Sequence, residues 1–253
     1  MKGDIEKIRK IIKELRGENG CPWDKKQNIE TLKPFLIEET YEVIENIDNK
    51  NWQGLSEELG DLLFLLFFII TIAEEENLFS LSDVVDKVCN KIINRHPHVF
   101  QKDNKITTPE EVEKQWYRLK QLEKRSVMEG IPKALPALMR AYKITKRAQQ
   151  IGFDWNSACE VFQKIKEEIE ELEKEIKGNN LNNIKLEIGD VLLSIVNLAR
   201  LLNINAEEAL HNACDRFLER FNYIEQKIKE MGKDFGEVSF HEMDALWDEA
   251  KRK

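Results

Sequence analysis

The chain is poor in residues that interrupt regular structure, with 11 glycines and 6 prolines among 253 residues. Long hydrophobic runs are missing too, since the longest, from Leu62 to Ala73, is well short of the roughly 20 residues that span a bilayer. The chain is also 42% apolar and 34% charged. This composition argues against a disordered chain and against a membrane protein, and it favours a helical globular protein in which residues 62–73 form a buried helix.

Cysteine is scarce and scattered. Its four positions, Cys21, Cys89, Cys159 and Cys214, form no Cys-x-x-Cys pair, so neither a disulfide framework nor a zinc site is indicated. The N-terminus leads into a charged amphipathic helix rather than a signal peptide. We therefore expect a reduced protein of the cytoplasm.

Positive charge is in deficit, with a formal net charge of −8 at pH 7 and an isoelectric point near 5.3. A general surface for a nucleic-acid polymer would need a basic face for the phosphates, so that class of partner is not expected. A single nucleotide needs only a few local cations. The charge balance therefore leaves a small phosphate ligand open.

Apolar residues recur at helical spacing along nearly the whole chain, and no segment shows convincing strand alternation. We therefore predict an all-α fold. Thr108 is predicted to cap a helix that starts at Pro109, and Gly178 to close the helix before Leu181. The longer expected helices cover residues 32–47, 55–75, 81–94, 109–124, 137–150, 158–177, 181–202, 206–231 and 241–252.

The two halves of the chain repeat one another. A break in the helical pattern from residue 129 to residue 136 marks the boundary, so we predict an N-terminal domain of residues 1–128 and a C-terminal domain of residues 129–253. The spacing of acidic residues carries the repeat. Glu58 follows Glu42 by 16 residues, and Glu187 follows Glu171 by 16.

Each half carries two acidic motifs in front of its most apolar helix. Residues three or four apart share a helix face, so two helices that pack antiparallel can point four carboxylates into one cleft. Like charges this close repel one another, and oxygen ligands favour hard cations, so we expect Mg²⁺ or Mn²⁺ there. The predicted metal ligands are Glu39, Glu42, Glu58 and Asp61 in the first half, and Glu168, Glu171, Glu187 and Asp190 in the second.

Each half then has two basic residues four apart and ends on a tryptophan followed four residues later by a lysine. Taken singly, these would be surface charges and core aromatics, but their repetition favours contact with phosphate and with a base or sugar. The residues are Lys91, Arg95, Trp116 and Lys120 in the first half, and Arg216, Arg220, Trp247 and Lys251 in the second.

These motifs resemble the MazG-type nucleoside triphosphate pyrophosphohydrolases, all-α enzymes whose signature is Glu-Glu-x-x-Glu followed by Glu-x-x-Asp. The resemblance runs over essentially the entire chain. Besides the acidic motifs, it includes Gly20-Cys21-Pro22-Trp23-Asp24, Arg95-His96-Pro97-His98-Val99-Phe100, Gly152-Phe153-Asp154-Trp155 and Met243-Asp244-Ala245-Leu246-Trp247.

The resemblance implies hydrolysis of a nucleoside triphosphate to the monophosphate and pyrophosphate, with Mg²⁺ held by the acidic residues. It implies that Arg216 and Arg220 hold phosphate and that Trp247 and Lys251 close on the nucleotide, with the first-half residues as the matching set. Arg216 stands where the family usually has lysine, which keeps the charge and changes the hydrogen-bonding geometry.

Two further residues follow from the same resemblance. Glu38 and Glu167, next to the ligand glutamates, are the candidates to position or deprotonate the attacking water. Broad base specificity is expected, because stacking on tryptophan tolerates any base.

Other interpretations stay open. A di-iron bundle would also place glutamates on facing helices, but the one Glu-x-x-His, from Glu208 to His211, has no partner in the repeat. A helical adaptor without activity would tolerate glutamine at the acidic positions. One half could be catalytic and the other structural or regulatory.

A homodimer is predicted for the assembly. Each half has more apolar helix face than its own helices easily cover, and the helices of the resembled family commonly pair between chains.

Overall fold

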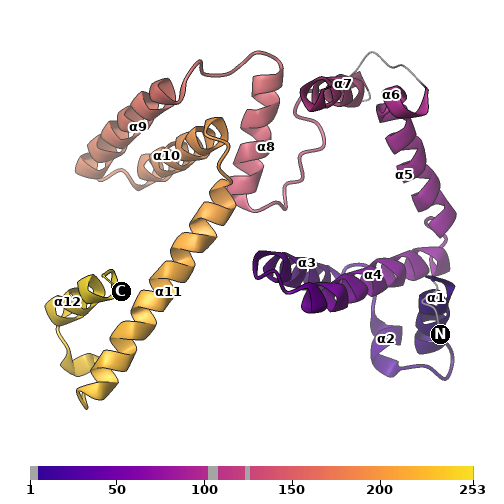
Figure 1. The fold of residues 1–253 in the computed structure, drawn as a ribbon, viewed down its shortest axis with the longest axis horizontal. Helices are drawn as coiled ribbons and strands as arrows, with labels where there is room; N and C mark the ends of the chain where they lie inside the picture. The colour runs from indigo at the N-terminus through magenta and orange to yellow at the C-terminus, as the bar shows by residue number, and fades with distance from the viewer. Residues whose placement is uncertain (1–4, 102–107, 123–125, 253) are drawn as a thin grey trace. The chain divides into compact units, whose positions relative to one another are not determined.

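The computed structural model describes residues 5–101, 108–122 and 126–252. These residues form helices and no strand, which confirms the all-α prediction. The chain divides into two units, Met1–Lys120 and Gln121–Lys253 (Figure 1). The domain boundary that we predict after residue 128 lies within the second unit. Among the described residues, no helix has the length and apolar character to cross a membrane.

The first unit is built on a helical hairpin. Helices α3 (Lys33–Asp48) and α4 (Trp52–Glu75) pack side by side, and α1 (Ile5–Arg16) packs against α4 while α2 (Pro22–Lys26) packs against α1 (Figure 1). Asn51 caps α4, since its side chain accepts a hydrogen bond from the Gly54 amide at 3.2 Å. The buried core between these helices contains Ile12, Leu32, Phe67, Phe68 and Ile72.

The remaining helices of this unit are α5 (Leu81–Arg95), α6 (Pro97–Phe100) and α7 (Pro109–Leu122). The Glu74 carboxylate joins α4 to α5 and α1, because it accepts the Leu81 amide at 3.0 Å and the Arg9 guanidinium at 3.2 Å. These bonds lower the pKa of Glu74, the Leu81 amide most strongly. The predicted cap of α7 is confirmed, since the Glu111 amide donates to Thr108 Oγ1 at 3.3 Å.

The second unit is built on the hairpin of α9 (Ala158–Gly178) and α10 (Leu181–Leu201), with α8 (Ala137–Gln150) against α10 (Figure 1). Helix α12 (Phe240–Ala250) folds back on the long α11 (Ala206–Glu230) after the short helix η1 (Phe235–Glu237). Ile224, Ile228, Val238 and Leu246 are buried between α11 and α12.

The turn between α9 and α10 lies at the predicted place, but the residue in the left-handed conformation is not the predicted glycine. Gly178 is the last residue of α9, and the left-handed conformation is taken by Asn179 at φ 55°. Asparagine tolerates that region better than other residues with a side chain, because its short amide bonds locally. Gly178 therefore does not take the left-handed position that usually explains a glycine at a helix end.

An arginine holds the loop ahead of each hairpin. In the first unit Arg16 Nη1 donates to the carbonyls of Asp24 and Gln27 at 2.7 and 3.1 Å, and Nη2 pairs with Glu75 at 2.6 Å. In the second unit Arg200 from α10 pairs with Asp154, with its Nη1 3.2 Å from Asp154 Oδ2. The Arg200 side chain is only 3% exposed and the Asp154 side chain 18% exposed, so this ion pair is largely buried.

Candidate active site

The first acidic cluster lies on the facing sides of α3 and α4. Glu39 comes from α3, and Glu58 and Asp61 come from α4 one turn apart. Each can offer a carboxylate oxygen within 4.8 Å of the others. Glu39 Oε2 is buried and has no hydrogen-bond partner among the described residues. A buried oxygen of this kind is costly unless something positive or a proton sits beside it.

The electrostatics of this cluster favour a cation. Burial raises the pKa of Glu39, and the charges of Glu42, Asp61 and Glu38 raise it further. Burial also raises the pKa of Glu58, with Glu42 as the next contribution. Glu42 therefore stands close to the cluster, although it is not one of the three residues whose oxygens converge.

The second acidic cluster repeats this arrangement on α9 and α10. Glu168 and Glu171 come from α9 and Glu187 from α10, again with oxygens within 4.8 Å of one another. Burial raises the pKa of Glu187, and the charges of Glu171, Asp190 and Glu168 add to it. Asp190 is exposed and lies outside the three converging residues.

Hence each predicted quartet becomes three converging carboxylates and one neighbour, and the neighbour differs between the halves. In the first half it is Glu42, from the helix that precedes the apolar one, and in the second half it is Asp190, from the apolar helix itself.

A tryptophan ring lies against basic side chains in each half, against two in the first and one in the second. In the first, Lys120 Nζ lies 4.6 Å and Arg95 Cζ 5.3 Å from the centre of the Trp116 ring. In the second, Arg220 Cζ lies 5.4 Å from the centre of the Trp247 ring. Cations at these distances from the centre of an indole ring are attracted by its electron density.

The other predicted basic residues are less constrained. Lys91 and Arg216 are exposed, and Lys251 pairs with Asp248 at 2.9 Å. Among the described residues, Arg216, Arg220 and Lys251 form no ion pair with the second acidic cluster. Each unit therefore has two groups of side chains, the converging carboxylates and the tryptophan with its neighbouring cations.

The two predicted catalytic glutamates lie beside the clusters and are exposed. Glu38 contributes to the field that raises the pKa of Glu39. Glu167 forms an ion pair with Lys164 at 3.0 Å. Both side chains are open to water, as a residue that positions a water must be.

Two segments of the chain, residues 27–100 and 157–224, match the model of the MazG nucleotide pyrophosphohydrolase domain. The chain belongs to the MazG family. Both acidic clusters and the residues Lys91, Arg95, Arg216 and Arg220 lie within the matched segments.

Similar proteins match along the whole chain. The nucleoside triphosphate pyrophosphohydrolase of Escherichia coli K12 is 39% identical over 257 residues, which cover 98% of this chain and 97% of that protein. The nucleoside triphosphate pyrophosphohydrolase/pyrophosphatase MazG of Thermotoga maritima is 42% identical over 251 residues, with 98% and 95% covered. A solved MazG-related protein from Thermotoga maritima covers 46% of this chain at 33% identity, with 98% of that chain aligned and a TM-score of 0.40.

The structure also points to two residues that were not among the predicted site residues, Lys164 and Trp155, of which Trp155 belongs to the Gly152-Phe153-Asp154-Trp155 motif. Lys164, one turn before Glu168, pairs with Glu168 at 2.9 Å as well as with Glu167. Trp155 lines a shallow hollow together with Lys164 and Glu167. The spacing of four residues between Lys164 and Glu168 on one helix was the available signal for the first of them.

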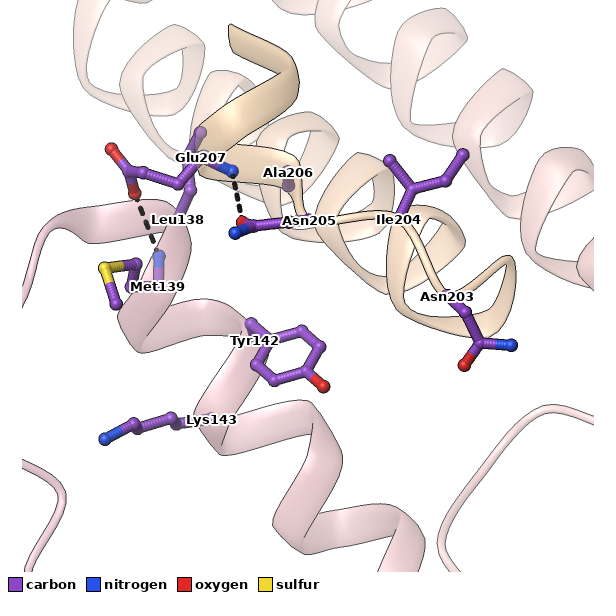
Figure 2. Close-up of a pocket in the computed structure, with 9 residues that line it drawn as sticks. All are labelled: Leu138, Met139, Tyr142, Lys143, Asn203, Ile204, Asn205, Ala206 and Glu207. Carbon is purple, nitrogen blue, oxygen red and sulfur yellow. Dashed lines mark hydrogen bonds between the residues drawn. The ribbon is translucent and has the colours of Figure 1, made fainter. Parts of the chain in front are cut away.

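A larger hollow of about 360 Å³ in the second unit is lined by none of the residues of the second acidic cluster (Figure 2). Leu138, Met139 and Tyr142 of α8 face the loop that leads into α11. Glu207 closes one end, where its carboxylate accepts the Met139 amide at 3.2 Å. That bond satisfies a free amide at the start of α8, so Glu207 has a structural role here.

Proposed function

We propose that this chain hydrolyses nucleoside triphosphates to nucleoside monophosphates and pyrophosphate, with broad specificity for the base. The observation that carries the proposal is the convergence of three carboxylates in each half, with a buried oxygen of Glu39 left without a partner. The full-length similarity to proteins named nucleoside triphosphate pyrophosphohydrolases supports the same reaction.

The residues fit a divalent cation, for which we propose Mg²⁺, with Mn²⁺ as a substitute. Glu39, Glu58 and Asp61 would hold it in the first half with Glu42 beside them, and Glu168, Glu171 and Glu187 in the second half with Asp190 beside them. All are hard oxygen donors, which Mg²⁺ prefers. When bound, such an ion neutralises phosphate charge and lowers the pKa of a bound water.

The protein's own side chains would do the rest. The Arg220 guanidinium and the Trp247 ring, already in contact, would hold phosphate and stack on the base, and Arg95 with Trp116 would do so in the first half. Lys91, Lys120, Arg216 and Lys251 would add positive charge. The carboxylates of Glu38 and Glu167 would accept a proton from the attacking water.

We propose a homodimer as the assembly. The helices that carry the carboxylates leave apolar side chains in water: Leu59, Leu63 and Leu66 of α4 are 49%, 37% and 45% exposed, and Leu192, Leu193 and Ile195 of α10 are 47%, 41% and 45% exposed. Contiguous apolar surface of this kind marks an association site. Light scattering at micromolar concentration should give twice the chain mass, and a monomer would contradict the proposal.

The direct test is pyrophosphate release from a panel of standard and altered nucleoside triphosphates with Mg²⁺. If one half is catalytic, its double variant, Glu39→Gln/Glu42→Gln or Glu168→Gln/Glu171→Gln, should lower turnover at least about tenfold, roughly 1.4 kcal/mol in the barrier; if both halves are catalytic, each double variant should lower it about twofold. Glu45→Gln and Glu170→Gln, exposed positions on the same helices, are the matched controls and should leave turnover unchanged. Full activity in both double variants would contradict the metal role of the clusters.

A further inference from the structure

The two acidic clusters differ at the residue one turn before the buried glutamate. In the repeat, Phe35 stands four residues before Glu39, and Lys164 stands four residues before Glu168. Phe35 packs against the apolar core, with its ring 5.8 Å from that of Trp23. Lys164 instead directs its ammonium group to the Glu168 carboxylate at 2.9 Å.

This difference sets the charge balance of each cluster. Glu168 is 7% exposed, and its nearest positive charge is supplied by its own helix. Glu39 Oε2 is also buried and has no hydrogen-bond partner among the described residues. The second cluster is therefore partly neutralised from within, and the first is not.

Lys164 is positively charged at neutral pH, as lysine side chains ordinarily are. Its side chain is 31% exposed and sits on a flexible four-carbon stem, so the ammonium group can leave the carboxylate for water. A divalent ion at Glu168 would break this ion pair and would be repelled by the ammonium group.

We propose that Lys164 is a resident cation of the second acidic site, which a divalent ion must displace, so that the second site binds the ion more weakly than the first. The inference rests on the metal role given to the clusters in the proposed function. It concerns the difference between the two sites, and it makes Lys164 a residue that sets metal affinity.

Direct Mn²⁺ binding on the full chain, by the loss of the free Mn²⁺ electron paramagnetic resonance signal and by titration calorimetry, tests the inference without any turnover. Glu168→Gln/Glu171→Gln leaves only the first site, and Glu39→Gln/Glu42→Gln leaves only the second. We expect the first site alone to bind Mn²⁺ about fivefold more tightly, as the loss of two partly exposed ion pairs implies.

The decisive variant is Lys164→Met in the chain that keeps only the second site, where we expect affinity to rise about fivefold toward that of the first site. Lys164→Gln should act in the same direction and guards against a packing effect of methionine. Lys166→Met is the matched control, because Lys166 lies on the same helix with its ammonium group over the Phe162 ring at 5.1 Å, and it should change nothing.

The outcomes separate this inference from the proposed function. Equal affinities of the two sites, tighter binding by the second site, or unchanged or weaker Mn²⁺ binding after loss of Lys164 would overturn the inference while both sites still bind metal. Absence of Mn²⁺ binding in both single-site chains would overturn the metal role itself, and the inference with it.

Discussion

The α3–α4 hairpin of the first unit and the α9–α10 hairpin of the second present the same acidic spacing in different surroundings. Where the first has Phe35, the second has Lys164, and where the first leaves Glu39 Oε2 without a partner, the second pairs Glu168. Similar divergence is seen at the loops, which Arg16 holds in one unit and Arg200 in the other. Both halves therefore have the converging carboxylates, but the side chains around them and the arginines that hold the preceding loops differ.

The largest expected effect is on stability, and it differs between Arg16 and Arg200, the arginines that hold the loops. Arg200→Ala leaves Asp154 without its partner inside the second unit, and we expect a loss of about 3 kcal/mol in the free energy of unfolding. Arg16→Ala removes hydrogen bonds at a more exposed place, where Glu75 is 44% exposed, and should lose about 1–2 kcal/mol. Urea unfolding followed by circular dichroism measures both.

Arg140→Ala, at an exposed position on α8, is the control for charge and should stay within about 0.5 kcal/mol of the parent chain. If Arg200→Ala lowers the free energy of unfolding less than Arg16→Ala does, the ion pair of Arg200 with Asp154 does not stabilise its unit more than the hydrogen bonds of Arg16 stabilise the first.

A second comparison concerns the tryptophans. Trp116→Leu and Trp247→Leu each remove a ring that lies against a guanidinium group, and we expect each to weaken one of two nucleotide sites by about 1–2 kcal/mol, roughly tenfold. Calorimetric titration with a non-hydrolysable nucleoside triphosphate measures this. Trp52→Leu, at a ring that is 67% exposed on α4, should have no effect.

An unchanged titration in Trp116→Leu would mean that only the second half binds nucleotide. The two halves would then share the carboxylate cluster but not nucleotide binding.

The smallest effect concerns stability without metal. The folded-state pKa of Glu39 is raised above its value in the unfolded chain, so its contribution favours folding at low pH and is lost as the pH rises through the raised value. Glu39→Gln removes the charge, and we expect it to stabilise the chain in EDTA at pH 7 by about 0.5 kcal/mol, a thermal shift of roughly 2 °C. Glu168→Gln, which breaks the pair with Lys164, should give no such gain.

Thermal melts between pH 4.5 and pH 7.5 should therefore converge for Glu39→Gln and the parent chain at the acidic end. A constant difference across this range would place the effect in packing rather than in the charge of Glu39.

Much of the fold could be predicted from periodicity and from end signals. Thr108 was correctly predicted to cap α7, because a side-chain cap is a local property of a few residues. The end of α9 was found as well, yet the left-handed residue proved to be Asn179, since local patterns do not decide between two adjacent residues that both tolerate it.

The site was predictable where it depends on helix geometry and less so where it depends on packing. The spacing within each motif placed Glu58 with Asp61, but which fourth carboxylate stands aside follows from how two helices are rotated against each other. Lys164 was missed because a lysine four residues before a glutamate is common on helix surfaces. Only the burial of Glu168 distinguishes this pair from those.

Helix α4 carries Glu58 and Asp61 on one side and exposed leucines on another, and α10 repeats this arrangement. If the apolar faces meet their counterparts on a second chain, the same helices bind the metal ion and form the dimer interface. Metal binding then changes the free energy of dimerisation, and dimerisation changes the free energy of metal binding by the same amount. Reaction velocity would then rise more steeply than linearly with the amount of enzyme at low concentration, and added ion would move the onset of that rise to lower concentration.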